Sequence, residues 1–248
     1  MEKIYLMYHD VYIHDKFESG FLRDRDMLYK MSVDLFHEHV KTVSDFCVES
    51  GSSKDAFVFT FDDGGKSFIS VIAPILEKYG FKGLFFITTE YIGHDTFLSE
   101  DDIRELRDRG HIIGSHAHTH EHLYLLSDSQ VEEEWKISTS ILNDILTEPV
   151  RCASIPNGDI SKRVIESAHK CGLNVLYSSQ PTTRTFWYNN VEVKGRYVIL
   201  ENHSTTYLMS IINSPFKRWF LMARSKVIQI IKSLLGENYI RLKSMILR

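Results

Sequence analysis

Two stretches of the sequence carry residue types that could do chemistry together. The first, FVFTFDDGGKSF at residues 57–68, places Asp62 and Asp63 directly after an apolar run. Two adjacent carboxylates repel each other, and burying them is costly unless a cation or hydrogen-bond donors compensate. Asp and Gly are also ordinary turn residues, so this stretch alone predicts either a simple turn or a metal or acid–base site.

The second stretch, GSHAHTHEHL at residues 114–123, contains four alternating histidines. His116 and His120 are four residues apart, and the other two histidines share that spacing, so either pair could reach one ion if the backbone turns. A lone histidine is most often structural, whereas four alternating histidines favour a functional role. Two imidazoles and one carboxylate suit Zn²⁺ or another first-row divalent ion with open positions. One of Asp62 and Asp63 could supply that carboxylate, which leaves the other free to act as a base.

The apolar pattern of the sequence predicts the strands and helices around these residues. Strand–helix alternation predicts parallel strands joined by helical crossovers, and seven strands suit a barrel-like sheet better than a short open one. The predicted strands are 4–8, 57–61, 84–88, 111–115, 152–155, 174–178 and 197–200. The predicted helices are 32–49, 66–79, 99–109, 127–146 and 161–170, with serine caps at Ser99, Ser127 and Ser161.

In parallel α/β barrels the reactive groups lie in loops at the carboxyl ends of the strands. The seven predicted strands then bring polar and titratable groups to one rim. These are Tyr8, His9, Asp10, Asp62, Asp63, Thr88, Thr89, the histidines of residues 116–122, Pro156, Asn157, Gly158, Ser178, Ser179, Glu201, Asn202 and His203.

Composition excludes several classes of protein. The 248 residues suffice for one large α/β domain or two small ones, and the net charge of −4 argues against nucleic-acid binding. Three widely spaced cysteines favour neither a disulfide framework nor a cysteine-based zinc site. The first residues, MEKIYLMYHD, lack the pattern of a signal peptide, and no apolar run reaches the length of a membrane span. We therefore expect a cytoplasmic protein, with peripheral contact at the inner face of a membrane as a second option.

The last part of the chain differs in charge from the rest. Residues 214–248 contain eight Lys or Arg and one Glu, a net charge of +7, so residues 1–213 carry −11. Apolar residues recur there at helical spacing, and Gly236 is a plausible helix stop. We predict a domain over 1–213 followed by a basic amphipathic helical tail over 214–248. Packing of this tail on the domain is the favoured interpretation, and contact with anionic lipid is the alternative.

The two chemical stretches resemble the first two motifs of the polysaccharide deacetylases, the NodB-homology or carbohydrate esterase 4 family. The matching segments are TFDDG at 60–64 and HAHTHEHL at 116–123. IYLMYHDV and SVDLFHEHV resemble the amino-terminal stretch of bacterial members acting on surface polysaccharides, and SIPNGDIS at 154–161 resembles a weakened third motif. The resemblance covers about residues 4–210 and implies a distorted (β/α) barrel.

The resemblance also implies roles for individual residues. The histidine spacing of the second motif selects His116 and His120, which with Asp63 would bind the metal, while Asp62 would be the general base. Metal-activated water would attack the carbonyl carbon of an N-acetyl group, with the backbone N–H of Asn157 helping to stabilise the oxyanion. Zinc is the expected metal, with Co, Ni, Mn or Fe as options.

The sequence departs from the family at its last motif, Leu-x-His. In VILENHS, His203 stands three residues after Leu200 rather than two, and KGRYVI at 194–199 resembles members without that motif. His203 and His9 are therefore both candidate general acids. The arginine and aromatic positions of the third motif are also poorly kept.

We expect a metal-dependent enzyme that deacetylates an N-acetylated sugar or polysaccharide. The alternatives are a degenerate barrel that binds glycan without turnover, and a metal hydrolase of another bond, such as a deformylase-type or phosphoester enzyme. The intact Asp62–Asp63 pair together with His116 and His120 favours an enzyme, because a protein that only binds glycan has no need of both.

Overall fold

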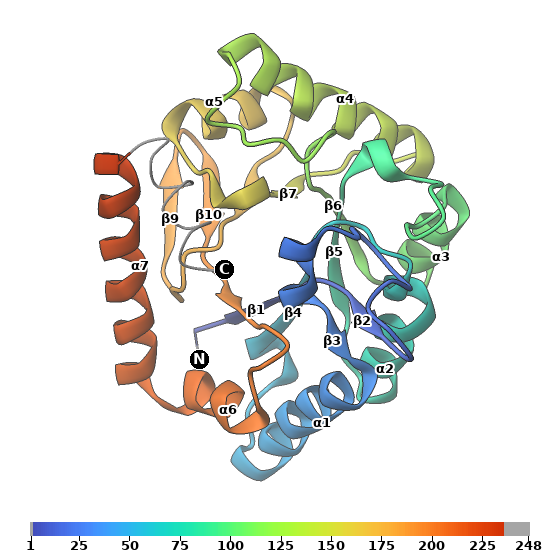
Figure 1. The fold of residues 1–248 in the computed structure, drawn as a ribbon, viewed down its shortest axis with the longest axis vertical. Helices are drawn as coiled ribbons and strands as arrows, with labels where there is room; N and C mark the ends of the chain where they lie inside the picture. The colour runs from blue at the N-terminus through green and yellow to red at the C-terminus, as the bar shows by residue number, and fades with distance from the viewer. Residues whose placement is uncertain (1, 236–248) are drawn as a thin grey trace.

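The computed structural model of the chain describes the backbone of residues 2–235 and the side chains of residues 2–228. Its centre is a strongly curled, mainly parallel sheet of nine strands that forms a half-barrel (Figure 1). Along the sheet the strand order is β11-β1-β4-β5-β6-β7-β8-β10-β9. The strands are β1 (Ile4–Tyr8), β4 (Phe57–Phe61), β5 (Gly83–Ile87), β6 (Ile112–Ser115), β7 (Cys152–Ser154), β8 (Val175–Tyr177), β9 (Thr185–Tyr188), β10 (Val191–Lys194) and β11 (Tyr197–Val198). A separate pair, β2 (Val11–Tyr12) and β3 (Met31–Ser32), lies beside it.

Helices surround this sheet (Figure 1). They are α1 (Val33–Ser50), α2 (Ala73–Lys78), α3 (Glu100–Asp108), α4 (Asp128–Leu146), α5 (Lys162–Lys170), α6 (Thr205–Asn213) and α7 (Pro215–Leu235). Short helical turns are η1 (Asp24–Tyr29), η2 (Lys54–Ala56), η3 (Phe68–Ile72), η4 (Thr89–Tyr91) and η5 (Pro156–Gly158). Ser99 and Ser127 form reciprocal capping boxes, and Ser161 caps α5, so these helices begin where their polar side chains satisfy free backbone N–H groups.

The predicted α/β barrel is confirmed, and all seven predicted strands are present to within a residue or two of their expected ends. The expected number of strands was too low. The sheet also contains β9 and β10, and β9 runs antiparallel at its edge. The predicted helix over 66–79 is the turn η3 followed by α2, and α6 was missed.

The period of two along β4 separates a helix-facing side from a barrel-facing side. Phe59 and Phe61 point into the aromatic layer beneath the helices, where Phe61 lies 5.8 Å from the ring of Phe36. Thr60 and Asp62 point the other way, and both contact the same guanidinium inside the barrel. The strand therefore delivers a carboxylate to the barrel interior at its carboxyl end.

The chain ends, within the described residues, in α7, which lies at the edge of the molecule and contacts α6 (Figure 1). The part of the predicted tail beyond residue 235 lies outside the described residues. No helix among residues 2–235 is long and apolar enough to cross a membrane.

Candidate metal centre

Neighbouring strand ends bring the two chemical stretches together. Backbone hydrogen bonds join their loops to β5, with the Thr88 N–H donating to the Asp63 carbonyl at 3.2 Å and the His116 N–H donating to the Ile87 carbonyl at 2.8 Å. Asp63 and the next residue, Gly64, have φ values of 87° and 96°. This left-handed turn ends β4 and redirects the side chain of Asp63 away from that of Asp62.

Asp63, His116 and His120 form a compact set of possible metal ligands. Their donor atoms all lie within 4.8 Å of one another, with Asp63 Oδ1 3.4 Å from His116 Nε2 and 3.3 Å from His120 Nε2. That oxygen is buried and makes no hydrogen bond of good geometry within the described residues. Burial raises the pKa of Asp63, but the two imidazoles outweigh it and hold this pKa well below its usual range. An ionised carboxylate facing two imidazoles fits a divalent cation.

A hydrogen bond on the side of the ring away from Asp63 fixes the orientation of His116. Its Nδ1 lies 3.1 Å from the carbonyl oxygen of Ser154 on β7. A carbonyl only accepts hydrogen bonds, so Nδ1 carries a proton and Nε2 is the nitrogen that points to Asp63. His120 itself has a φ of 64°, and its imidazole also points to Asp63. The ring of Phe21 packs against this imidazole, with ring centroids 5.1 Å apart.

The other two histidines of this loop have different partners. His118 Nδ1 lies 2.9 Å from the hydroxyl of Thr89, and His122 Nδ1 lies 3.0 Å from a carboxylate oxygen of Asp159. Neither belongs to the set of converging donor atoms found in residues 2–228. The alternating pattern thus separates into a pair that faces Asp63 and a pair that anchors the loop.

Asp62 has a different environment from its neighbour. Arg196 clamps it with two hydrogen bonds, of 2.6 Å to Oδ1 and 2.8 Å to Oδ2, and the Ser154 hydroxyl donates to Oδ2 at 2.9 Å. Burial raises the pKa of Asp62, but the charges of Arg196 and His116 outweigh it and lower the pKa overall. Asp62 is therefore an oriented, ionised acceptor next to the ligand set, 4.0 Å from His116 Nε2.

Arg196 was not among the residues selected from the sequence. It is 1% exposed and lies between β10 and β11, 134 residues from Asp62. Its guanidinium also donates to the hydroxyl of Ser154 at 2.7 Å. The only sign of this role in the sequence was the presence of an arginine within KGRYVI, a run otherwise typical of a strand.

His9 lies within electrostatic reach of both aspartates. Burial raises the pKa of Asp62 and Asp63, and the imidazole of His9 is among the groups that lower both. Its ring stacks at a tilt on Tyr29, with centroids 4.5 Å apart, and its buried Nδ1 has no hydrogen-bond partner in the described part of the chain. Burial and the charge of Asp63 raise the pKa of Tyr29, so both rings border the site.

His203 lies in a different environment. Its ring stacks on Tyr207 at 3.8 Å, and its Nδ1 accepts the backbone N–H of Leu200 at 3.1 Å. Burial, followed by the charge of Lys217, lowers the pKa of His203. Within residues 2–228 the structure shows no contact of His203 with Asp62 or Asp63.

Asn157 lies beside the loop that carries His116 and His120. It adopts φ of 57° within η5, and its side-chain amide donates to the carbonyl of His120 at 3.3 Å. The short turn after β7 therefore borders the same site as His120.

Known proteins share part of this sequence and its fold. The sequence signature of the family described as polysaccharide deacetylase matches residues 49–176. The chain is 28% identical over 129 residues to YxkH of Bacillus subtilis, which covers 52% of this chain and 46% of that protein. It is 25% identical over 139 residues to the peptidoglycan-N-acetylmuramic acid deacetylase PdaA of the same organism, which covers 52% of this chain and 49% of PdaA. These matches span about half the length of both relatives.

Among solved structures, the Streptococcus pyogenes deacetylase PplD in complex with acetate superposes with a TM-score of 0.72 at 20% identity, covering 86% of this chain and 99% of that one. This likeness shows a shared fold. Because the family signature matches just over half of the sequence, the chain belongs to the polysaccharide deacetylase family.

Proposed function

We propose that this chain is a metal-dependent hydrolase that removes the N-acetyl group from an N-acetylated sugar of a polysaccharide or glycan precursor. The observation that carries the proposal is the Asp63–His116–His120 set with an ionised, clamped Asp62 beside it. Two similar proteins, the deacetylases PdaA and PplD, support the reaction class.

The residues present fit a divalent cation, and zinc suits two imidazoles and one carboxylate best, with Co, Ni, Mn or Fe as alternatives. When bound, such an ion would polarise the acetyl carbonyl and make a coordinated water more acidic. Asp63, His116 and His120 would hold it.

The chain's own residues then supply the proton transfers. Asp62 accepts a proton from the attacking water, whose oxygen bonds to the acetyl carbon. Arg196 keeps Asp62 oriented for this step. The backbone N–H of Asn157 would donate to the oxyanion. As the C–N bond breaks, the leaving nitrogen takes a proton, and His9 is the better-placed donor because it faces the aspartates whereas His203 does not. The products are acetate and a free amine.

The test combines metal analysis with acetate release from N-acetylhexosamine oligomers. His120→Ala should lose bound metal and activity together, because a ligand is removed. His118→Ala is the matched control, since it lies in the same loop but bonds to Thr89, and it should retain the metal. Full metal occupancy in His120→Ala would overturn the ligand assignment. Glycan binding without acetate release by the metal-loaded wild type would favour the non-catalytic barrel, and release of another group would favour a different hydrolase.

A further inference from the structure

The outward face of α7 carries a stripe of exposed apolar side chains. Phe216 is 72% exposed, Trp219 56%, Phe220 51% and Val227 55%. At 100° per residue these four positions lie on one side of the helix. The rings of Phe216 and Trp219 also stack on each other, with centroids 5.8 Å apart. A contiguous patch of this kind usually marks an interaction surface, whereas isolated exposed apolar residues do not.

The opposite face of α7 already attaches the helix to the domain. Arg218 donates to the carbonyls of Ile211 and Ile212 at the end of α6, both at 2.8 Å. Leu221 packs against the main hydrophobic core. The outward stripe is therefore not needed to hold the helix in place.

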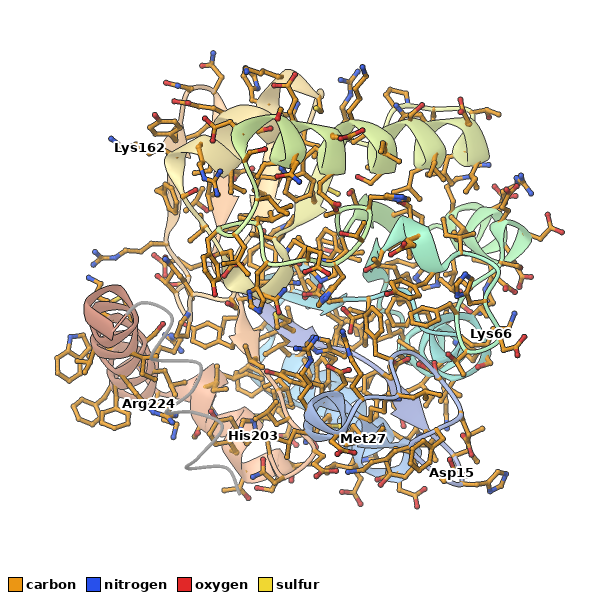
Figure 2. The ribbon with its side chains drawn as sticks, turned by 45° about the horizontal axis from the view of Figure 1, so that its top comes forward. Asp15, Met27, Lys66, Lys162, His203 and Arg224 are labelled. Atoms are coloured by element: carbon orange, nitrogen blue, oxygen red, sulfur yellow. The ribbon has the colours of Figure 1, made fainter. Side chains whose placement is uncertain are left out.

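Basic residues flank the stripe on both sides. Arg224 and Lys226 are exposed and fall about 80° to either side of its centre. Figure 2 shows α7 at the edge of the molecule, with Arg224 on it. The sequence of α7 contains five Lys or Arg and no Asp or Glu.

We propose that this face of α7 docks on the surface of an anionic lipid bilayer, with the stripe at the acyl boundary and the flanking cations at the headgroups. Aromatic rings bordered by Lys and Arg are typical of helices that lie in a membrane interface. A second copy bound symmetrically through this face would set cations against cations, so charge favours lipid over self-association. The proposal does not depend on the deacetylase reaction.

The experiment measures co-sedimentation of the full chain with vesicles. Vesicles of phosphatidylglycerol and phosphatidylcholine should pull the protein down at low salt, and 0.5 M NaCl should release most of it. Vesicles of phosphatidylcholine alone should bind it much less. If the protein stays in the supernatant with the anionic vesicles at low salt, the proposal is overturned.

Two sets of variants assign the binding to α7. Replacing Phe216, Trp219 and Phe220 together with Ser should reduce vesicle partitioning by more than about tenfold, because the apolar contact is lost. Trp187→Ser on β9 is the matched control, since Trp187 is 67% exposed but lies outside α7, and it should bind as the wild type does.

The charges are tested in the same assay. Arg224→Gln with Lys226→Gln should reduce partitioning by about 25-fold, at about fivefold for each cation near an anionic surface. Lys41→Gln with Lys170→Gln removes the same charge from α1 and α5 and should have a much smaller effect.

Tryptophan fluorescence reports whether the stripe itself meets lipid. In Trp187→Phe, the remaining tryptophans are the buried Trp135 and the exposed Trp219. Brominated phosphatidylglycerol should then quench the emission of Trp219. Sedimentation without quenching would overturn the proposal. The proposal would also be overturned if light scattering showed a dimer of the wild type and a monomer of the triple serine variant. In that case a second copy of the chain would cover the stripe.

Discussion

Two adjacent residues of one type acquire different tasks from their surroundings. Asp62 is paired with a guanidinium and a hydroxyl, which leave it ionised and fixed. Asp63 faces two imidazoles, with Oδ1 3.4 and 3.3 Å from the Nε2 atoms of His116 and His120, an arrangement that suits a shared cation. The left-handed turn at Asp63 is what sends the two side chains to different partners.

This division of roles predicts the behaviour of Asp62→Asn. The amide keeps the shape of the side chain but cannot accept a proton, so acetate release should fall by about 10²–10⁴-fold. Bound metal, measured by elemental analysis, should remain near the wild-type level. Asp63→Asn is the comparison, and it should lose the metal. Near-normal turnover in Asp62→Asn would show that another group is the base.

At this scale the sequence predicted the residues that lie in short motifs. Type and spacing drew attention to the two aspartates and the four histidines, and the resemblance to the family's motifs then selected His116, His120 and Asp63 among them. Arg196 could not be recognised in this way, because its role depends on a contact across 134 residues that exists only once the sheet has curled.

Among the elements, α4 organises the loop over residues 116–122, which carries His116 and His120. The carboxylate of Glu134 accepts the backbone N–H groups of His118 and Thr119 at 2.8 and 2.9 Å, and the Thr119 hydroxyl at 2.7 Å. Ala117 and His120 hold left-handed backbone angles on either side of these bonds. The helix therefore supports a backbone shape that presents His120 to Asp63.

Glu134→Ala should loosen that loop without removing a ligand. We expect metal affinity to fall by about 10–100-fold, as is usual when a group supporting a ligand is lost. Competition with a chelator measures this affinity. Glu133→Ala, an exposed neighbour on the same helix, is the control and should change little. Equal affinities in the two variants would mean that the loop holds its shape without α4.

A second contact between elements predicts a pH effect. His39 on α1 is buried, and its Nδ1 lies 3.2 Å from the hydroxyl of Tyr8 at the end of β1. Burial lowers the pKa of His39 from 6.5 to about 4. The unfolded chain therefore binds the proton more readily than the folded one, and stability is lost as pH falls from 6.5 towards 4.

Replacing His39 with Gln removes this titration. The stability of the wild type relative to His39→Gln should decline by on the order of 3 kcal/mol between pH 7 and pH 4. Urea unfolding at several pH values measures the difference. His14→Gln, at an exposed position, should leave the pH dependence of the wild type unchanged. A constant difference between wild type and His39→Gln would show that His39 titrates alike in both states.

The sequence predicted most elements because their apolar periodicity is strong and their serine caps mark the starts. The hairpin of β9 and β10 was missed because β9 is an exposed edge strand without a buried face. Its turn, Asn189 and Asn190, has positive φ at both residues, and adjacent asparagines were the available signal.

For the whole molecule, the notable feature is that the curled sheet does not close. β10 and β11 are consecutive but not paired, and among the described strands the sheet ends at β11 on one side and β9 on the other. Arg196 stands in this interval and binds Asp62 after β4, the Ser154 hydroxyl on β7 at 2.7 Å and the Ser178 carbonyl after β8 at 3.3 Å. One buried side chain thus ties three strands across the open barrel.

Arg196→Met should consequently destabilise the whole domain. It leaves the carboxylate of Asp62 buried without its cation, which costs about 3–5 kcal/mol of unfolding free energy. In an Asp62→Asn background that charge is absent, so the same substitution should cost markedly less. Urea unfolding of the wild type, both single variants and the double variant gives the coupling between the two residues.

The control for this cycle is Arg151→Met, which removes an exposed arginine and should stay within about 0.5 kcal/mol of the wild type. A coupling energy near zero would mean that Arg196 acts through packing, such as its position 5.3 Å over the ring of Phe86, rather than through charge. A large coupling would show that one ion pair both orients the proposed base and holds the open barrel together. Catalysis and global stability would then depend on the same buried contact, and variants of Arg196 should lose both.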